Sequence, residues 1–140
     1  MGVPNADELL ALYAEGKRDF SESALAGANL REANLSEANL SHTDLNGGNL
    51  REANLHWTDL RGADFREANL SGANLSGADL SGADLSGADL SEADLFGANL
   101  RNADLTDAIL DEASGAYYDG DTHWPSGFDP AKSGMILREE

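Results

Sequence analysis

The stretch SGADLSGADLSGADLSEADL, residues 76–95, is four near-copies of one five-residue phrase, and it decides the fold. A period of five fits neither a helix nor a continuous strand. On a helix, leucines five apart would lie about 140° from one another, so Leu80, Leu85 and Leu90 would form no apolar stripe. In a strand, an odd period sends successive leucines to opposite faces. The chain is therefore expected to turn within every copy.

The order of residue types within each copy indicates which side chains face inward. Ala and Leu, two residues apart, are expected on the inner side of a short extended segment, with the intervening Asn or Asp pointing outward. The next two residues, often Ser-Gly, form a corner in which Gly supplies a positive φ. Repeated corners coil the chain, and stacked coils pair their backbone groups about 4.8 Å apart. The sequence predicts an all-β solenoid with a column of leucines inside.

The repeat covers the middle of the 140-residue chain without interruption. From residue 28 to residue 110, the pattern Ala-(Asn/Asp)-Leu-x-x runs for seventeen copies with no inserted residue. Five positions depart from it: Thr43, Gly48, Thr58, Phe65 and Ile109. We assign residues 18–112 to the solenoid.

The two ends of the chain do not follow the five-residue repeat and are expected to cap the solenoid. Residues 1–17 contain a predicted amphipathic helix over 5–16, with Asn5 as its N-cap and Gly16 at its C-terminal stop. Residues 113–140 hold concentrated aromatic and aliphatic bulk and are expected to form an irregular C-terminal cap. Open ends of a β-solenoid template aggregation, and caps prevent it.

Composition narrows the function classes. Nine Lys and Arg residues against 26 Asp and Glu give a formal charge of −17, which opposes direct binding to nucleic acid or to an anionic membrane. Cysteine is absent, so thiol chemistry is excluded. The longest apolar run near the N-terminus, LLALYA, is too short for a signal sequence or a membrane span. We expect a cytoplasmic protein.

The sequence offers no catalytic, cofactor-binding or metal-binding constellation. Its three histidines, His42, His56 and His123, fall on two different faces and in the tail, so no pair has the geometry of metal ligands or of a general base. The many serines are corner residues without a His or Lys in register. We predict that the protein is not an enzyme and needs no cofactor.

The A(N/D)Lxx tandem resembles that of the pentapeptide repeat family, over about 60% of the chain. The flanks LLALYAEGKRDF (9–20) and YYDGDTHWPSGFDPAKSG (117–134) are similar to those of cyanobacterial members. The resemblance implies a right-handed quadrilateral β-helix with four pentapeptides per coil, Leu at the centre of each face and Ala just inside it. It also implies that a biochemical function is hard to assign, because most such proteins have none known.

With four repeats per coil, residues twenty apart stack on one face, and two columns are candidate interaction surfaces. One column is acidic throughout and contains Asp44, Asp64, Asp84 and Asp104. Two other columns carry mostly Asn at this position. The acids are therefore either a binding strip for a basic partner or the result of drift between Asn and Asp, which suit the same turn. The other column places His56, Trp57 and Phe96 on one face, either as an interface or as isolated surface aromatics.

Two functions from different classes remain open. The first is a rigid structural or protein-interaction module, monomeric or weakly dimeric, with an unidentified protein partner. The second is an acidic DNA mimic that binds a DNA-processing enzyme, because the resemblance extends to fluoroquinolone-resistance pentapeptide proteins that bind gyrase and the −17 charge has the required sign. This chain lacks loop insertions in its repeat, and its tail differs from that of the gyrase-binding proteins. Both differences disfavour the second function.

Overall fold

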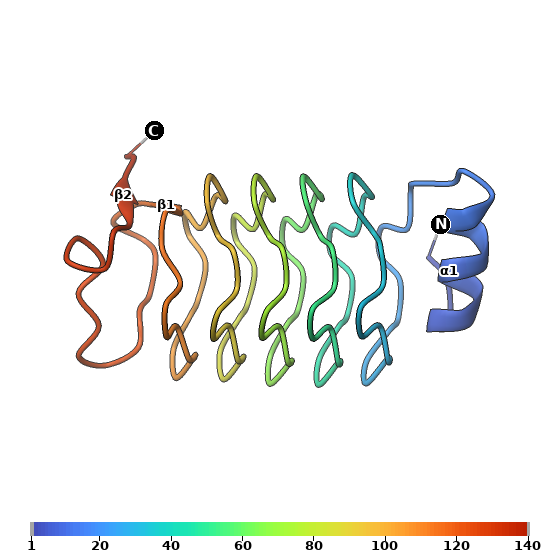
Figure 1. Cartoon of the computed structure of the whole chain (residues 1–140), viewed down its shortest axis with the longest axis horizontal. Helices are drawn as coiled ribbons and strands as arrows, with labels where there is room; N and C mark the ends of the chain where they lie inside the picture. The colour runs from blue at the N-terminus through green and yellow to red at the C-terminus, as the bar shows by residue number, and fades with distance from the viewer. Residues whose placement is uncertain (1, 140) are drawn as a thin grey trace.

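The computed structural model describes residues 2–139 and has the shape of a rod built from stacked coils, with a helix at one end (Figure 1). Parallel bridges join residues twenty positions apart, from Asp19↔Asn39 through to Asp89↔Ile109. Each coil therefore consists of four pentapeptides, and each pentapeptide contributes one bridge residue and one two-residue turn. Because the turns occupy so much of each repeat, the rungs of the solenoid are single bridges and not regular strands.

The backbone of each pentapeptide is hydrogen-bonded both within its own turn and to the adjacent coils. Around Leu70, for example, its N–H donates to the carbonyl of Asp89 in the following coil at 2.8 Å. The N–H of Asn69 donates to the carbonyl of Gly48 in the preceding coil at 2.9 Å, and the N–H of Ala68 closes the turn onto the carbonyl of Phe65 at 3.0 Å. This pairing satisfies backbone groups that would otherwise be buried without partners.

The core is a column of leucines lined by alanines. The central residue of every pentapeptide is almost fully buried, from Phe20 and Leu25 to Leu105, and the alanines two residues before these positions are buried from Ala38 onward, with Thr43, Gly48 and Thr58 in the same place. Ala28 and Ala33 in the first coil are only half-buried. Leucine side chains fill the interior of each coil. The residue beside each turn is small, which leaves room for the side chains of the next face of the coil.

Each turn places its second residue in the left-handed region. Gly77 has φ +69°, and other turn glycines lie close to this value. Within residues 2–139, eleven residues with side chains adopt the same conformation, among them Glu52 at φ 60° and Trp57 at φ 58°. The left-handed conformation costs a residue with a Cβ roughly 1–2 kcal/mol. The solenoid therefore holds these residues in a conformation that is locally unfavourable.

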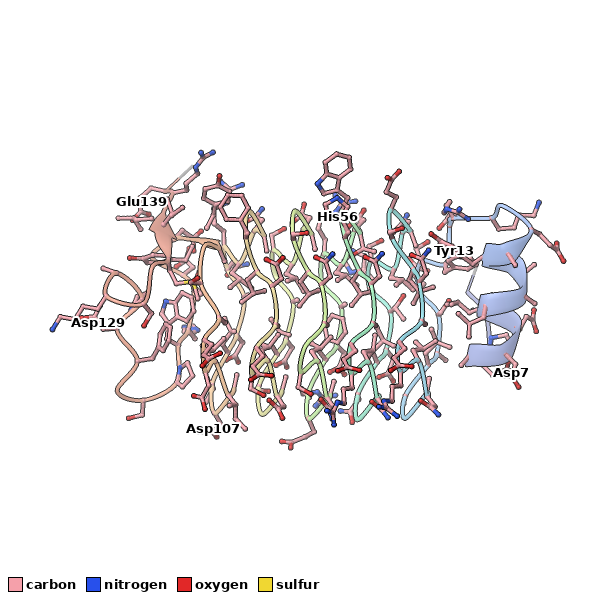
Figure 2. The ribbon with its side chains drawn as sticks, in the orientation of Figure 1. Asp7, Tyr13, His56, Asp107, Asp129 and Glu139 are labelled. Atoms are coloured by element: carbon pink, nitrogen blue, oxygen red, sulfur yellow. The ribbon has the colours of Figure 1, made fainter. Side chains whose placement is uncertain are left out.

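The helix α1 (Ala6–Ala14) lies across the N-terminal end of the rod. Asn5 is its N-cap, and its side chain accepts the N–H of Glu8 at 2.8 Å. Leu9 is fully buried against the core. The Tyr13 hydroxyl, on the side of α1 that faces the first coil, donates to the carbonyl of Ser36 at 2.8 Å (Figure 2).

The tail continues the ladder past residue 112. Tyr117 bridges to Asn99 and His123 bridges to Asp104, at offsets shorter than twenty residues. The strand β1 (Tyr117–Tyr118) then pairs in parallel with β2 (Ile136–Leu137). The tail is therefore more regular than its sequence indicates. Within residues 2–139, no helix is both long enough and apolar enough to cross a membrane.

Candidate functional site

His56, Trp57 and Phe96 lie at one corner of the solenoid, where the turns of successive coils stack. The turn residues His56–Trp57, Ser76–Gly77 and Phe96–Gly97 follow one another, joined by the bonds Trp57 N–H to Ser76 O and Gly77 N–H to Phe96 O, both 3.0 Å. We call these six residues the aromatic corner. Figure 2 labels His56 of this corner at the upper edge of the rod.

The Trp57 side chain is exposed but held in place. Its ring stacks on His56, with 4.7 Å between centroids and 21° between planes. The His56 Nδ1 lies 2.6 Å from the Ser76 hydroxyl of the next coil, which fixes the imidazole. The indole also leans over Gly77, where a Cβ would collide with it. The absence of a side chain at Gly77 therefore makes room for Trp57 on the corner.

Between Trp57 and Phe96 the corner is hollowed. The hollow has a volume of about 620 Å³, and its walls include Asp94 and Tyr117 as well as the aromatic corner. Phe96 leans away from Trp57, toward Gly115 in the following turn. A second hollow of about 280 Å³ shares Gly77, Gly97 and Tyr117 with the first.

Gly77→Ala should destabilise the protein more than Gly82→Ala. The two glycines have φ +69° and +70°, so the left-handed strain of about 1–2 kcal/mol is common to both. At Gly77 the new Cβ also displaces Trp57, whereas at Gly82 its nearest neighbour is the Asn102 amide nitrogen at 4.0 Å. Thermal melts would measure the difference, and fluorescence quenching in a Trp124→Phe background would show increased exposure of Trp57. Equal losses would mean that Trp57 is not held over Gly77.

The bridges place Asp44, Asp64, Asp84 and Asp104 in consecutive coils, as the twenty-residue spacing predicts, and we call them the acidic strip. Each carboxylate accepts the backbone N–H two residues on, for example Ser86 N–H to Asp84 Oδ1 at 3.0 Å. Asn69 makes the same bond with the Ser71 N–H at 3.0 Å. The local role of the strip is thus to close turns, which Asn does equally well.

An arginine crosses the acidic strip and reduces its charge. Arg66 binds Asp64 through two nitrogens, with Nη2 2.7 Å from Oδ2, and its Nε lies 3.9 Å from Asp84 Oδ2 in the next coil. Hydrogen bonding from this guanidinium lowers the pKa of Asp64, and the same contact raises the pKa of Arg66. At the far end of the strip, the hydrogen bond from the Thr106 hydroxyl lowers the pKa of Asp104. Asp64 and Asp104 therefore ionise readily, and Arg66 balances part of the charge of the strip.

Changing all four strip aspartates to Asn should leave the fold intact and alter the free energy of unfolding by no more than about 1 kcal/mol. Asn keeps the turn acceptor, and relief of repulsion between the acids offsets the loss of the Arg66 pairs. Urea denaturation at low and high salt would measure this, with Arg66→Gln as the control that removes the pairs alone. A large loss in the quadruple variant would show that the carboxylates themselves are required.

With the coil geometry described, the family can be assigned. A family model described as pentapeptide repeats (8 copies) matches residues 19–51, 49–87 and 88–114. The chain belongs to the pentapeptide repeat family. Pentapeptide repeat proteins fold as right-handed quadrilateral β-helices, and the four turns per coil seen here agree with that architecture. The solenoid predicted from the period of five, and the β-helix implied by the resemblance, are confirmed.

Several solved structures are similar to this pentapeptide repeat protein. The protein alr5209 from Nostoc PCC 7120 is 38% identical, with 99% of each chain covered and a TM-score of 0.69. Rfr23 from the cyanobacterium Cyanothece 51142 is 37% identical over 76% of this chain and 63% of its own, with a TM-score of 0.41. QnrB1, a plasmid-mediated fluoroquinolone resistance protein, is 19% identical over 87% of this chain and 79% of its own, with a TM-score of 0.40. A comparison with curated protein sequences found no match.

The structure adds residues to the corner that sequence reasoning missed. Asp94 and Tyr117 line the hollow beside Phe96. Asp94 could have been found, since it precedes Phe96 by two residues and so belongs to the same turn. Tyr117 could not, because the tail has lost the twenty-residue spacing that assigns residues to columns. Among residues 2–139, no group of three His, Asp or Glu side chains has an arrangement that could hold a metal ion.

Proposed function

We propose that this pentapeptide repeat protein is a non-enzymatic interaction module whose aromatic corner binds a protein partner. The observation that carries the proposal is the exposure of two large aromatic side chains at one corner, Trp57 at 62% and Phe96 at 73%. Aromatic side chains are enriched at protein interfaces, and exposed apolar groups gathered around a hollow are typical of binding sites. Members of the family are generally structural or interaction modules without enzymatic activity.

The rigidity of the corner supports binding. Trp57 is held by its stacking on His56 and by the space over Gly77. A side chain that is ordered before the partner arrives loses little conformational entropy on binding. The floor of the corner is backbone that is hydrogen-bonded to the adjacent coils, so it gives the partner a fixed surface.

We further propose that residues 1–17 and 113–140 cap the solenoid of residues 18–112 and leave its sides for the partner. At the first end, Leu9 of α1 is buried against the core. At the other end, Ala116 and Met135 are buried, and β2 extends the ladder beyond β1. Segments that take up the open backbone groups at both ends restrict further stacking of chains.

The proposal is tested by placing a photoreactive benzoylphenylalanine at one of three positions of the same coil, Phe96, Ser86 or Ser91. Phe96 is part of the aromatic corner, Ser86 lies beside Asp84 of the acidic strip, and Ser91 lies on neither surface. Irradiation in cells of the source organism should give a protein adduct from position 96 alone. Adding Trp57→Gly should remove that adduct, because the variant deletes half of the aromatic surface.

The three positions separate the outcomes. An adduct from position 86 alone would contradict the aromatic corner and assign partner binding to the acidic strip. Equal adducts from all three positions, or none from position 96, would also contradict the proposal. The three positions share one coil and one turn position, so the photoreactive group has the same backbone setting in each variant.

The second candidate, a DNA mimic, is supported by the −17 charge and by the alignment of the acidic strip. One feature opposes it. Arg66 pairs with Asp64 and approaches Asp84, which lowers the charge at the middle of the strip. Inhibition of gyrase supercoiling at micromolar protein or below would favour the mimic over the interaction module.

A further inference from the structure

We propose that the segment bound at the aromatic corner is a basic, proline-rich stretch in the polyproline II conformation. This inference rests on the proposed function and adds the chemistry of the partner. It is carried by the spacing of the aromatic groups, the bare floor between them and the charge around them.

The spacing of the corner matches the period of a polyproline II helix. His56 and Phe96 occupy the same turn position two coils apart, with Ser76 between them. Two coil spacings amount to about 9.6 Å. A polyproline II helix has three residues per turn and a rise of about 3.1 Å, so residues i and i+3 are about 9.3 Å apart on one side. Such residues can contact the His56–Trp57 pair and Phe96 together.

Other peptide conformations fit the corner less well. Residues on one face of an extended strand repeat about every 6.6 Å, which falls between the two aromatic groups. An α-helix brings residues i and i+7 to about 10.5 Å, which matches the spacing of about 9.6 Å less closely than the polyproline II repeat does. Aromatic-lined grooves that bind proline-rich peptides exploit a conformation that the peptide already holds when free.

The floor of the hollow suits flat apolar rings. An added Cβ at Gly97 would meet nothing closer than the backbone of Gly77, at 3.9 Å. A proline ring can therefore lie against the backbone, between Trp57 and the Phe96 and Tyr117 side. The Trp57 indole N–H has no hydrogen-bond acceptor among the described residues, and polyproline II carbonyls have no internal donor.

The charges around the hollow favour a basic ligand. Asp94 lines the hollow, and its carboxylate accepts the Phe96 N–H at 3.0 Å but forms no ion pair within residues 2–139. Glu37 occupies the turn of the preceding coil at the same corner, and its N–H donates to the His56 carbonyl. Arg138 lies over the Tyr117 ring, 4.1 Å from its centroid, and lines the second hollow and not this one. A chain of charge −17 steers cationic segments toward it, and an Arg or Lys of the ligand beside Asp94 completes the contact.

The test is a titration of the full chain with a synthetic peptide of three Leu-Pro-Pro triplets followed by two arginines, monitored by calorimetry and by backbone amide NMR. One control peptide has glycine in place of every proline, and another has glutamate in place of both arginines. We expect the first peptide to bind and each control to bind at least about tenfold more weakly. Amide shifts should be confined to the aromatic corner and its neighbours.

Matched variants locate the binding. Phe96→Ser places at this turn position the residue found there at Ser76, and Trp57→Gly suits a φ of 58°. Each should weaken binding about tenfold or more. His42→Gly is the control, because His42 has φ 56° and leans over Gly62 at a different corner. It should bind the peptide as the parent does.

The outcomes of these titrations are decisive for the chemistry of the ligand. Failure of the proline peptide to bind, equal binding of all three peptides, or unchanged affinity in Phe96→Ser would overturn the inference. A position-96 adduct that contains a second copy of this chain would overturn it as well. If the peptide fails but position 96 still captures a different protein, the ligand chemistry is wrong and the interaction module stands. If no adduct forms at position 96, the interaction module itself fails.

Discussion

Leu70→Ala should lower the free energy of unfolding by about 2–5 kcal/mol. Leu70 is fully buried near the middle of the rod, with Leu50 and Leu90 at the same position of the adjacent coils. The backbone on both sides is held by bonds to the neighbouring coils, so the cavity left by the leucine cannot collapse easily. Urea denaturation would measure the loss.

The neighbouring change, Asn69→Ala, is the control. The Asn69 side chain is half-exposed, and it accepts the Ser71 N–H at 3.0 Å and the Ser71 hydroxyl at 2.7 Å. Loss of such turn bonds typically costs about 0.5–1.5 kcal/mol. If both variants lost the same stability, Leu70 and Asn69 would not have the inward and outward roles described here.

Removal of residues 115–140 should convert the protein into a self-associating species. The N–H groups of Leu100 and Leu105 donate to the carbonyls of Tyr117 and His123 at 2.7 Å, and truncation leaves both donors open. It also uncovers the apolar end of the leucine column, where Leu110 is now 7% exposed. Open β-edges beside apolar surface pair with other chains. Light scattering coupled to size-exclusion chromatography would detect the change.

A shorter truncation is the control for the removal of residues from the C-terminal end. A chain that stops at Leu137 keeps both β1 and β2, and with them the bridges to Asn99 and Asp104. It should elute as the parent does. A 115–140 deletion that remained as monodisperse as this control would show that the tail is not a cap.

The solenoid could be predicted because each local preference repeats in register. Leu, Asn or Asp, and Gly recur at fixed places in a five-residue repeat. An error in assigning one of these places to the inner or outer side would therefore recur in every copy. The columns follow once the family resemblance supplies four repeats per coil, and the acidic strip and the trio of His56, Trp57 and Phe96 could then be grouped from the sequence. The presence of Glu or Trp at left-handed turn positions was not predictable, since local preference alone favours Gly there.

Sequence by itself determined the five-residue repeat and the inward leucines, because these depend only on a period that never slips between residues 28 and 110. The four repeats per coil, and with them the membership of each column, followed from the resemblance to the pentapeptide repeat family, and the bridges between residues twenty apart agree with them. The tertiary structure alone decided what each column presents. In the structure, Trp57 lies over Gly77, and Tyr117 of the aperiodic tail lines the hollow. Arg66 extends across two coils of the acidic strip. These outcomes depend on side-chain direction and on contacts between coils, and a linear spacing carries no information about either.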